Sequence, residues 1–374
     1  MRRERRYRLP EGRPKPRGGI GWLLAALALG AVVWIWWRAA HDAGSNQAGK
    51  RTSAGEDSRT PHVARQNKRP SANGMTHPPP AAKISATRLP AEQLLAAQIA
   101  LDRLAISPGS LDAMPGSQTR AALLAFQRQA KLPETGELDA ATRSRLLPVA
   151  PVLAGYTVTT NDLARLQPLS KTWLGKSQQS ALDFETILEL VAEKSHAHPD
   201  LLRRLNPDAD WTNLTAGMVL RVPGVASTNA AVPVRAAYVT ISLTNKVLEV
   251  FDAETNLLAH FPCSIARRVE KRPVGELHVT AVAPNPNYTF DPEVFPESPE
   301  AQQLKTRLIL PPGPNNPVGT VWISLDRPGY GIHGTPNPEQ VGRTESHGCF
   351  RLANWNAEKL LNLVWVGMPV YVEP

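Results

Sequence analysis

The sequence predicts a multidomain α+β protein: an N-terminal transmembrane helix, a small three-helix domain, a small α/β module and a mostly-β C-terminal domain. Three observations predict it: a long apolar run near the N-terminus, helical spacing of apolar residues further along, and strand-like alternation near the C-terminus. The 374 residues leave room for two or three folded domains.

The net charge of +9 is concentrated at the N-terminus. Residues 1–17 contain eight Lys or Arg and two Asp or Glu, which gives +6, while the rest of the chain carries 34 basic and 31 acidic residues, only +3. A nucleic-acid-binding surface needs a concentrated basic face. We therefore expect no nucleic-acid partner.

The basic tail at residues 1–17 leads into residues 18–37, a run of 20 uncharged, mostly apolar residues. At ~1.5 Å per residue it spans roughly 30 Å, the thickness of a bilayer core. The positive-inside rule places the tail in the cytoplasm and the chain after residue 38 on the other side. A cleaved signal peptide is the alternative, but its apolar region would be shorter. We expect a single-pass inner-membrane protein with its folded part in the periplasm.

Residues 38–90 are rich in Ala, Ser, Pro, Asn and basic residues and lack apolar periodicity. Such a segment cannot bury a core, so we expect a flexible linker.

Residues 91–148 show apolar residues at helical spacing. Ser117 is expected to cap a second helix that runs towards Gly136, and Asp139 a third helix that runs to Leu147. The strings Met114–Arg120, Ala125–Arg128 and Leu132–Gly136 resemble the three-helix peptidoglycan-binding domain. Such a domain either binds the cell wall or serves as a spacer.

Residues 155–224 begin with a short strand-like string, end with another, and carry helical sequence between them. This pattern resembles a LysM-like carbohydrate-binding module. Residues 160–180 are extra sequence after the first strand, which departs from that family.

Residues 236–373 alternate between apolar and less apolar residues, with turns predicted at Thr244-Asn245 and from Asp252 to Asn256. Residues 284–317 hold nine prolines and little periodicity. A long irregular segment in a compact domain is often a lid or binding loop.

The string Ser346-His347-Gly348-Cys349-Phe350-Arg351 follows His333-Gly334-Thr335 closely and places a cysteine beside two histidines. A thiol becomes a strong nucleophile when a nearby imidazole takes its proton. The glycines beside these residues are expected to allow close backbone approach to the reacting atoms. The other cysteine, Cys263, lies in an apolar strand-like run and is expected to be a free core residue.

These strings, together with Pro273-Val274-Gly275 and Leu308–Thr320, resemble the L,D-transpeptidase catalytic domain over residues 236–373. The resemblance implies a mixed β-sandwich with the cysteine and histidines near one end. Phe350 stands where the family usually has a β-branched residue, and Asn356 where Asp is common.

The resemblance also implies a reaction that needs no cofactor or metal. Cys349 attacks a peptidoglycan stem tetrapeptide, D-alanine leaves, and a thioester forms. An amine then resolves the thioester; it comes from another stem peptide or from a lipoprotein lysine. The expected partners are therefore stem peptides and glycan, the inner membrane through the N-terminal helix, and a lipoprotein acceptor.

The resemblance assigns roles to individual residues. His333 is the candidate general base, oriented by the carbonyl group of Gly334. The backbone N–H groups of Gly348 and Cys349 are expected to stabilise the oxyanion. Three further residues complete the predicted site: His347, which lines the pocket or assists proton transfer, and Ser346 and Arg351, which are expected to bind substrate. Alternatively, Arg351 forms a salt bridge within the fold and does not bind substrate.

Other functions remain open from the sequence. An L,D-carboxypeptidase or endopeptidase would release the same thioester to water. A zinc site formed by His333, His347 and Cys349 lacks a fourth ligand, and the chain could also be a catalytically inactive wall-binding protein.

Overall fold

The computed structural model describes residues 90–147, 151–225, 235–295, 298–304, 306–344 and 348–374. The predicted basic tail, transmembrane helix and nearly all of the predicted linker therefore lie outside the described residues. In the part of the chain that is described, no helix has the length and apolar character needed to cross a membrane.

The first described region contains three helices: α2 (Ala91–Arg103), α3 (Ser117–Gln129) and α4 (Ala140–Leu146). The prediction of three helices is confirmed. They bury a common core, which includes Ala97, Leu101, Ala122, Phe126 and Leu146.

Two details of these helices differ from the prediction and one agrees. Asp139 caps α4, since its carboxylate accepts a hydrogen bond from the backbone N–H of Thr142 at 2.8 Å. Ser117 does not cap α3: it is the first helical residue, and Gly116 holds the cap position in an extended conformation without a side-chain bond. Helix α3 also ends at Gln129, well before Gly136, because Lys131 turns the chain with a φ of 56°.

The second region pairs strands β1 (Leu153–Thr157) and β2 (Val219–Pro223) antiparallel. Between them lie four helices: α5 (Thr160–Ala164), α6 (Trp173–Ser177), α7 (Ile187–Lys194) and α8 (Pro199–Leu205). Helix α7 begins with a capping box, in which Thr186 and Glu189 satisfy each other's backbone N–H groups. Two strands enclosing helices agree with the predicted layout, while the LysM-like identity stays a prediction.

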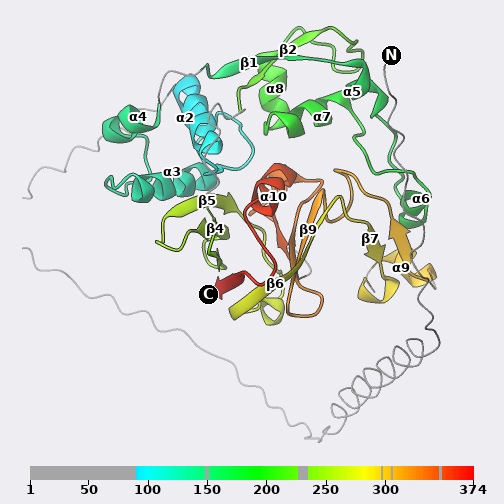
Figure 1. Ribbon diagram of the computed structural model, residues 1–374. Coiled ribbons are helices and arrows are strands. Elements are labelled where there is room, and N and C mark those ends of the chain that lie inside the picture. The colour runs from blue at the N-terminus through cyan, green and yellow to red at the C-terminus, as the bar shows by residue number, and fades with distance from the viewer. Residues whose placement is uncertain (1–89, 148–150, 226–234, 296–297, 305, 345–347) are drawn as a thin grey trace, which may run out of the picture. The chain divides into compact units, whose positions relative to one another are not determined.

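The third region is built on an eight-stranded sheet of order β11-β10-β9-β6-β12-β3-β4-β5 (Figure 1). The strands are β3 (Tyr238–Ser242), β4 (Val247–Phe251), β5 (Leu257–Pro262), β6 (Gly275–Pro284), β9 (Val321–Leu325), β10 (Gly331–His333), β11 (Phe350–Arg351) and β12 (Pro369–Glu373). Pairs β12–β3 and β10–β11 are parallel and the others antiparallel, so the sheet is mixed, as predicted.

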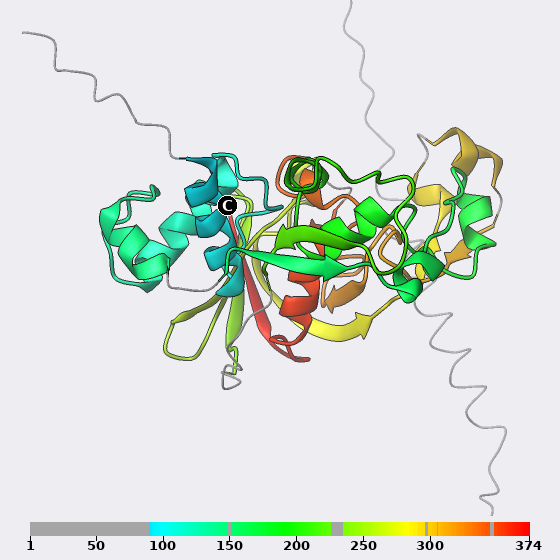
Figure 2. The same cartoon turned by 90° about the horizontal axis from the view of Figure 1, so that it is seen from above.

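The two ends of this sheet are joined by backbone hydrogen bonds. Ser264, just after β5, exchanges two bonds with Arg351 of β11, at 2.9 and 3.0 Å. The sheet therefore folds back on itself, like a sandwich, around a core that includes Ile241, Phe261, Ile323 and Phe350. Helix α10 (Asn354–Leu361) lies against the sheet in the view from above (Figure 2).

Cys263 is fully buried in this core, and neither Cys263 nor Cys349 is part of a disulfide bond. The prediction of a free core residue is confirmed. The predicted turns are also present, because Thr244-Asn245 lies between β3 and β4, and Asp252–Asn256 between β4 and β5.

The proline-rich segment at residues 284–317 is more regular than predicted. It contains β7 (Tyr288–Phe290), which pairs antiparallel with β8 (Leu308–Leu310), as well as η2 (Pro292–Val294) and α9 (Pro299–Gln303). We call β7, β8 and α9 the lid hairpin. Three-residue strands are too short to give a periodic signal, which explains the difference. Two further 3₁₀ helices, η1 (Val269–Lys271) and η3 (Pro338–Gln340), lie elsewhere in this region.

Candidate active site

The parallel pairing of β10 with β11 brings His333 and Cys349 together. Ile332 pairs with Phe350 and His333 with Arg351. Because paired residues share a face of the sheet, His333 and Arg351 lie on the same face. Cys349 directly precedes β11, and the charge of Arg351 acts on both His333 and Cys349. The thiol sulfur of Cys349 lies 3.6 Å from the carbonyl oxygen of Gly329, just before β10.

His333 is buried, and one hydrogen bond fixes its ring. Its Nδ1 lies 2.6 Å from the carbonyl oxygen of Gly334, which is the contact that the sequence analysis expected. A carbonyl oxygen only accepts, so Nδ1 carries the hydrogen and Nε2 keeps its lone pair. The indole of Trp322 stacks on the ring, with centroids 5.5 Å apart.

Burial keeps both reacting groups neutral. Burial lowers the pKa of His333 to about 4. The hydrogen bond with Gly334 opposes this shift, and the positive charge of Arg351 adds to it. Burial also raises the pKa of the Cys349 thiol, although a backbone hydrogen bond from Gly331 and the charge of Arg351 oppose this. This environment favours a neutral thiol and a neutral imidazole in the resting site.

Arg351 and Tyr288 complete the electrostatic surroundings of the thiol. Burial lowers the pKa of Arg351, while Cys349 and Tyr288 oppose the shift. Burial raises the pKa of Tyr288 to about 12; the charge of Cys349 adds to the rise and Arg351 opposes it. Tyr288 belongs to β7, so the lid hairpin contributes to the electrostatic surroundings of the thiol, a contribution that no sequence motif signalled.

Asn354, the first residue of α10, is a second residue that the sequence analysis did not select. Its Oδ1 accepts hydrogen bonds from the backbone N–H groups of Thr335, at 2.9 Å, and Thr320, at 3.3 Å. Its Nδ2 donates to the carbonyl oxygen of Pro314 at 3.2 Å. Asn354 thus holds the backbone that directly follows His333-Gly334.

The glycines near the histidine are needed for packing against Asn354. A Cβ atom at Gly334 or at Gly319, whose φ is +63°, would collide with the Asn354 Oδ1. At Gly348 a Cβ atom would meet nothing within 4 Å. The sequence analysis expected glycine at position 334 to let the backbone approach the reacting atoms. In the structure, glycine is needed there because the side chain of Asn354 packs against it.

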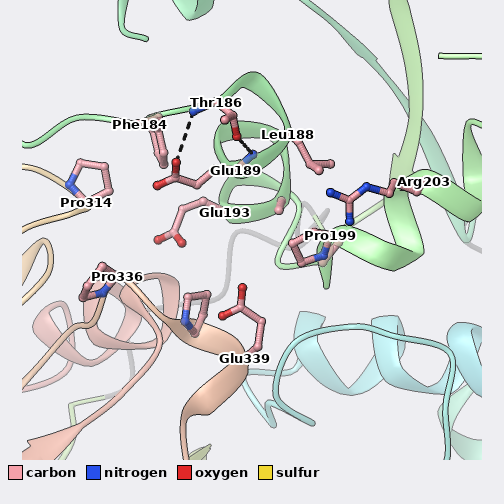
Figure 3. Close-up of a pocket in the computed structure, with 13 residues that line it drawn as sticks. Phe184, Thr186, Leu188, Glu189, Glu193, Pro199, Arg203, Pro314, Pro336 and Glu339 are labelled. Carbon is pink, nitrogen blue, oxygen red and sulfur yellow. Dashed lines mark hydrogen bonds between the residues drawn. The ribbon is translucent and has the colours of Figure 1, made fainter. Parts of the chain in front are cut away.

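A cavity of about 260 Å³ lies between α7 and the segment after Thr335 (Figure 3). None of its lining residues is a predicted catalytic residue. Glu189, Glu193 and Glu339 line it, and the carboxyl group of Glu193 points into it. Burial raises the pKa of Glu193 to about 8; a hydrogen bond with Asn354 opposes the rise, and Glu358, Glu189 and Glu339 add to it. Glu193 therefore holds its proton at neutral pH.

Ser346 and His347 lie outside the described residues, so the structure brings together His333, Gly334, Gly348, Cys349 and Arg351 but does not place these two. Their predicted roles, and the oxyanion role of Gly348 and Cys349, stay predictions. Within the described ranges, no group of three or more His, Cys, Asp or Glu is arranged to hold a metal ion.

Comparison with known families matches two parts of the chain. Residues 236–372 match the YkuD family, described as the L,D-transpeptidase catalytic domain. Residues 90–146 match a domain family provisionally described as peptidoglycan binding.

Individual relatives agree with these matches. A Bacillus licheniformis protein, provisionally named L,D-transpeptidase YkuD, is 26% identical over 187 residues, which cover 50% of this chain and 93% of the relative. A Bacillus subtilis protein, provisionally named L,D-transpeptidase YqjB, is 31% identical over 137 residues, which cover 35% of this chain and 63% of the relative.

Among solved structures, L,D-transpeptidase 3 from Mycobacterium tuberculosis is 19% identical with a TM-score of 0.30, over 42% of this chain and 68% of that chain. An L,D-transpeptidase from Mycobacterium smegmatis is 18% identical with a TM-score of 0.29, over 42% of this chain and 66% of that chain.

Proposed function

Because residues 236–372 are an L,D-transpeptidase catalytic domain and residues 90–146 a peptidoglycan-binding domain, we propose that this enzyme cross-links peptidoglycan through a cysteine thioester. The acyl donor is the stem tetrapeptide. The Cys349 sulfur attacks the carbonyl carbon of the third residue, the bond to the terminal D-alanine breaks, and a thioester with the remaining tripeptide forms.

His333 moves the protons in this mechanism. Its free Nε2 takes the thiol proton as the sulfur attacks, and the resulting imidazolium gives that proton to the leaving amine of D-alanine. In the second step the same nitrogen takes a proton from the acceptor amine as the amine attacks the thioester carbonyl carbon. The carbon–sulfur bond breaks, and the imidazolium returns that proton to the departing sulfur of Cys349. Arg351 binds a substrate carboxylate or oxyanion, and Gly348 and Cys349 supply the backbone N–H donors.

The observation that carries this proposal is the 2.6 Å contact between Nδ1 of His333 and the carbonyl oxygen of Gly334. It fixes the tautomer that leaves Nε2 unprotonated, and His333 pairs with Arg351, two residues after Cys349. No carboxylate is needed for this orientation. The lowered pKa of His333 adds support, because a neutral imidazole is the form that acts as a base.

We assign the accessory regions to substrate delivery. The domain at residues 90–146 holds the chain on peptidoglycan, and the module at residues 155–224 binds glycan in the manner of a LysM module. The acceptor amine comes from a second stem peptide, with a lipoprotein lysine as the alternative.

We also propose that residues 18–37 anchor the enzyme in the inner membrane with the catalytic domain in the periplasm. The support is the apolar run of 20 residues and the excess of basic residues before it. Protease added to spheroplasts should remove the catalytic domain and leave a short membrane stub. Native protein that begins after residue 38 would show a cleaved signal and remove the anchor.

The function is tested by incubating the full chain with purified tetrapeptide-containing dimers and identifying the products by mass spectrometry. Release of D-alanine with new cross-links, absent for Cys349→Ala, is the expected result. Release of D-alanine with tripeptides alone would identify a carboxypeptidase and contradict the transferase. Cleaved dimers would identify an endopeptidase.

A further inference from the structure

Residues 165–184, which include α6, pack against the lid hairpin, more than 100 residues further along the chain. We call them the clamp segment. Helix α6 contacts β8, and it lies beside β7 and α9 in Figure 1. The clamp segment overlaps the stretch at residues 160–180 that departs from the LysM-like pattern, so these extra residues make a contact of their own.

The apolar part of this contact centres on Trp173. Its indole stacks on the ring of Phe290, with centroids 4.3 Å apart and planes 14° apart. It also lies 6.1 Å from the ring of Phe295 and 6.5 Å from that of Tyr288. Fully buried Leu182 from the clamp segment and Leu310 from β8 belong to the same cluster. The clamp segment and the lid hairpin thus share one small core.

Hydrogen bonds fix the register of the two segments. The Glu300 carboxylate of α9 accepts bonds from the backbone N–H groups of Trp173, at 2.9 Å, and Leu174, at 3.0 Å. Just after the lid hairpin, the carbonyl oxygen of Pro312 accepts a hydrogen bond from the backbone N–H of Leu182 at 2.8 Å. The backbone N–H of Asn315 donates to the carbonyl oxygen of Leu182 at 2.9 Å. Contacts at several points along both segments hold the hairpin in one position.

The clamped hairpin carries a side chain of the candidate active site. Tyr288 and Phe290 lie two residues apart on β7 and therefore on the same face of that strand. Tyr288 interacts electrostatically with Cys349 and Arg351. The stacking of Phe290 on Trp173 therefore constrains the position of Tyr288, whose ring centroid also lies 6.5 Å from that of Trp173.

We propose that the clamp segment is a positioning element of the enzyme, which holds the lid hairpin over Cys349 and so limits which acyl donors reach the thiol. This proposal rests on the proposed transpeptidase function. Trp173 is its central positioning residue and acts through Phe290 and Tyr288. The second region of the chain thereby shapes donor selection in addition to any part it plays in wall binding.

The first test needs no substrate. In the full chain, Cys349 is alkylated with a small reagent, iodoacetamide, and with a bulky fluorescent maleimide, and the ratio of the two rates is recorded. Cys263 is fully buried, so the signal comes from Cys349. We expect Trp173→Ala to raise the ratio of bulky to small reagent about 3- to 10-fold, the range of a lost aromatic stack.

Three further variants separate positioning from general damage. Trp173→Phe keeps an aromatic ring and should restore the wild-type ratio. Glu300→Gln keeps Trp173 but replaces one acceptor oxygen of Glu300 with an NH₂ group, which cannot accept a hydrogen bond from the backbone N–H that faces it. This variant should therefore also raise the ratio of bulky to small reagent. Leu174→Ala is the matched control, because Leu174 lies on the same helix with 46% of its side chain exposed.

Kinetics give the second readout. The KM for the tetrapeptide should rise about 3- to 10-fold in Trp173→Ala while kcat changes by less than about threefold, because the chemistry at Cys349 is intact. Folded Trp173→Ala and Glu300→Gln proteins with the wild-type alkylation ratio would overturn the clamp. If Trp173→Ala does not fold, Glu300→Gln decides. A changed ratio in a chain that never turns over tetrapeptide would overturn the proposed function and leave the clamp standing.

Discussion

At the scale of single residues, the candidate active site is a neutral imidazole and a neutral thiol. In the resting site the proton is still on the sulfur of Cys349 and has not passed to His333. His333 and Cys349 are both buried, and burial disfavours charge on each. A neutral thiol is protected from adventitious oxidation, which proceeds through the thiolate. Proton transfer to Nε2 of His333 is therefore coupled to attack on the substrate carbonyl.

This pairing predicts an unusual pH dependence. The pKa of His333 is lowered to about 4, so the base stays unprotonated until the pH falls far below the ordinary histidine value. The acid limb of kcat/KM should therefore lie near pH 4 to 5, and not near 6.5. A measured acid limb at pH 6.5 that moves only in His347→Ala would reverse the assignment of the base.

The histidine variants refine that prediction. His333→Ala should lower the rate more than His347→Ala, by about 100-fold or more, since it removes the general base. The rate of Cys349 alkylation against pH measures the thiol directly. Because His333 is neutral at rest, its loss removes no charge that stabilises the thiolate. The alkylation titration should therefore move little in either variant, and the loss of turnover should separate His333→Ala from His347→Ala.

At the scale of elements, α10 supports the catalytic segment through its first residue. Asn354→Ala leaves the buried backbone N–H group of Thr335 and the half-buried one of Thr320 without their acceptor. We expect a loss of about 3 kcal/mol in the free energy of unfolding and a drop in kcat of about 10- to 100-fold from misplacement of His333. Urea denaturation and steady-state kinetics measure the two effects.

The matched control is Asn362→Ala, because exposed Asn362 bonds only the carbonyl oxygen of Glu358 near the end of the same helix. Its stability should stay within about 0.5 kcal/mol of the wild type. Equal effects of the two substitutions would show that Asn354 has no special part in positioning.

Helix α7 carries Glu193, whose pKa makes the stability of the fold depend on pH. Its pKa is raised from 4.5 to about 8 in the folded state. The free energy of unfolding therefore falls as the pH rises from about 4.5 through 8. Glu193→Gln should therefore stabilise the protein at pH 9 and change little at pH 4. The pKa change alone corresponds to about 5 kcal/mol; since the side chain is partly exposed, we expect about half.

Thermal unfolding at the two pH values tests this prediction. Glu185→Gln, an exposed glutamate just before α7, is the control and should have little effect at either pH. A Glu193→Gln protein that is less stable than the wild type at pH 9 would contradict the raised pKa.

At the scale of the whole molecule, three regions meet at Asp102. This fully buried carboxylate of α2 lies 2.9 Å from Nδ1 of His196, just after α7, and 3.3 Å from Nζ of Lys359 in α10. The His196 ring stacks on Trp355, at 5.1 Å between centroids. Since α10 also carries Asn354, the accessory regions are joined to the helix that supports the catalytic segment.

Asp102→Asn should destabilise the docked regions by about 3 kcal/mol, because it leaves buried partners unpaired. Burial opposes ionisation, but His196 and Lys359 outweigh it and lower the pKa of Asp102 to about 2. The stabilisation is therefore present above about pH 4 and is lost as the pH falls towards 2. Asp200→Asn, which breaks an exposed pair with Arg203, should cost less than about 1 kcal/mol. Equal losses of unfolding free energy in Asp102→Asn and Asp200→Asn would contradict the proposal that Asp102 joins the three regions.

The sequence predicts well what local patterns encode. Alternation at residues 238–251 predicts β3 and β4, and the string around Cys349 predicts the site. Features built from distant segments left no local signal: Asn354 is an ordinary polar residue in sequence, and Tyr288 lies in a segment of three-residue strands. Asp102 and Trp173 gain their partners only when regions more than 90 residues apart come together.

The central claim, a thioester on Cys349, is tested most directly by intact mass spectrometry of the full chain mixed with a tetrapeptide donor and no acceptor amine. We expect a mass increase equal to the acyl tripeptide, with one D-alanine released for each chain acylated. Cys263→Ala should form the same adduct, and Cys349→Ala should form none. D-alanine release by a folded Cys349→Ala protein would contradict the mechanism.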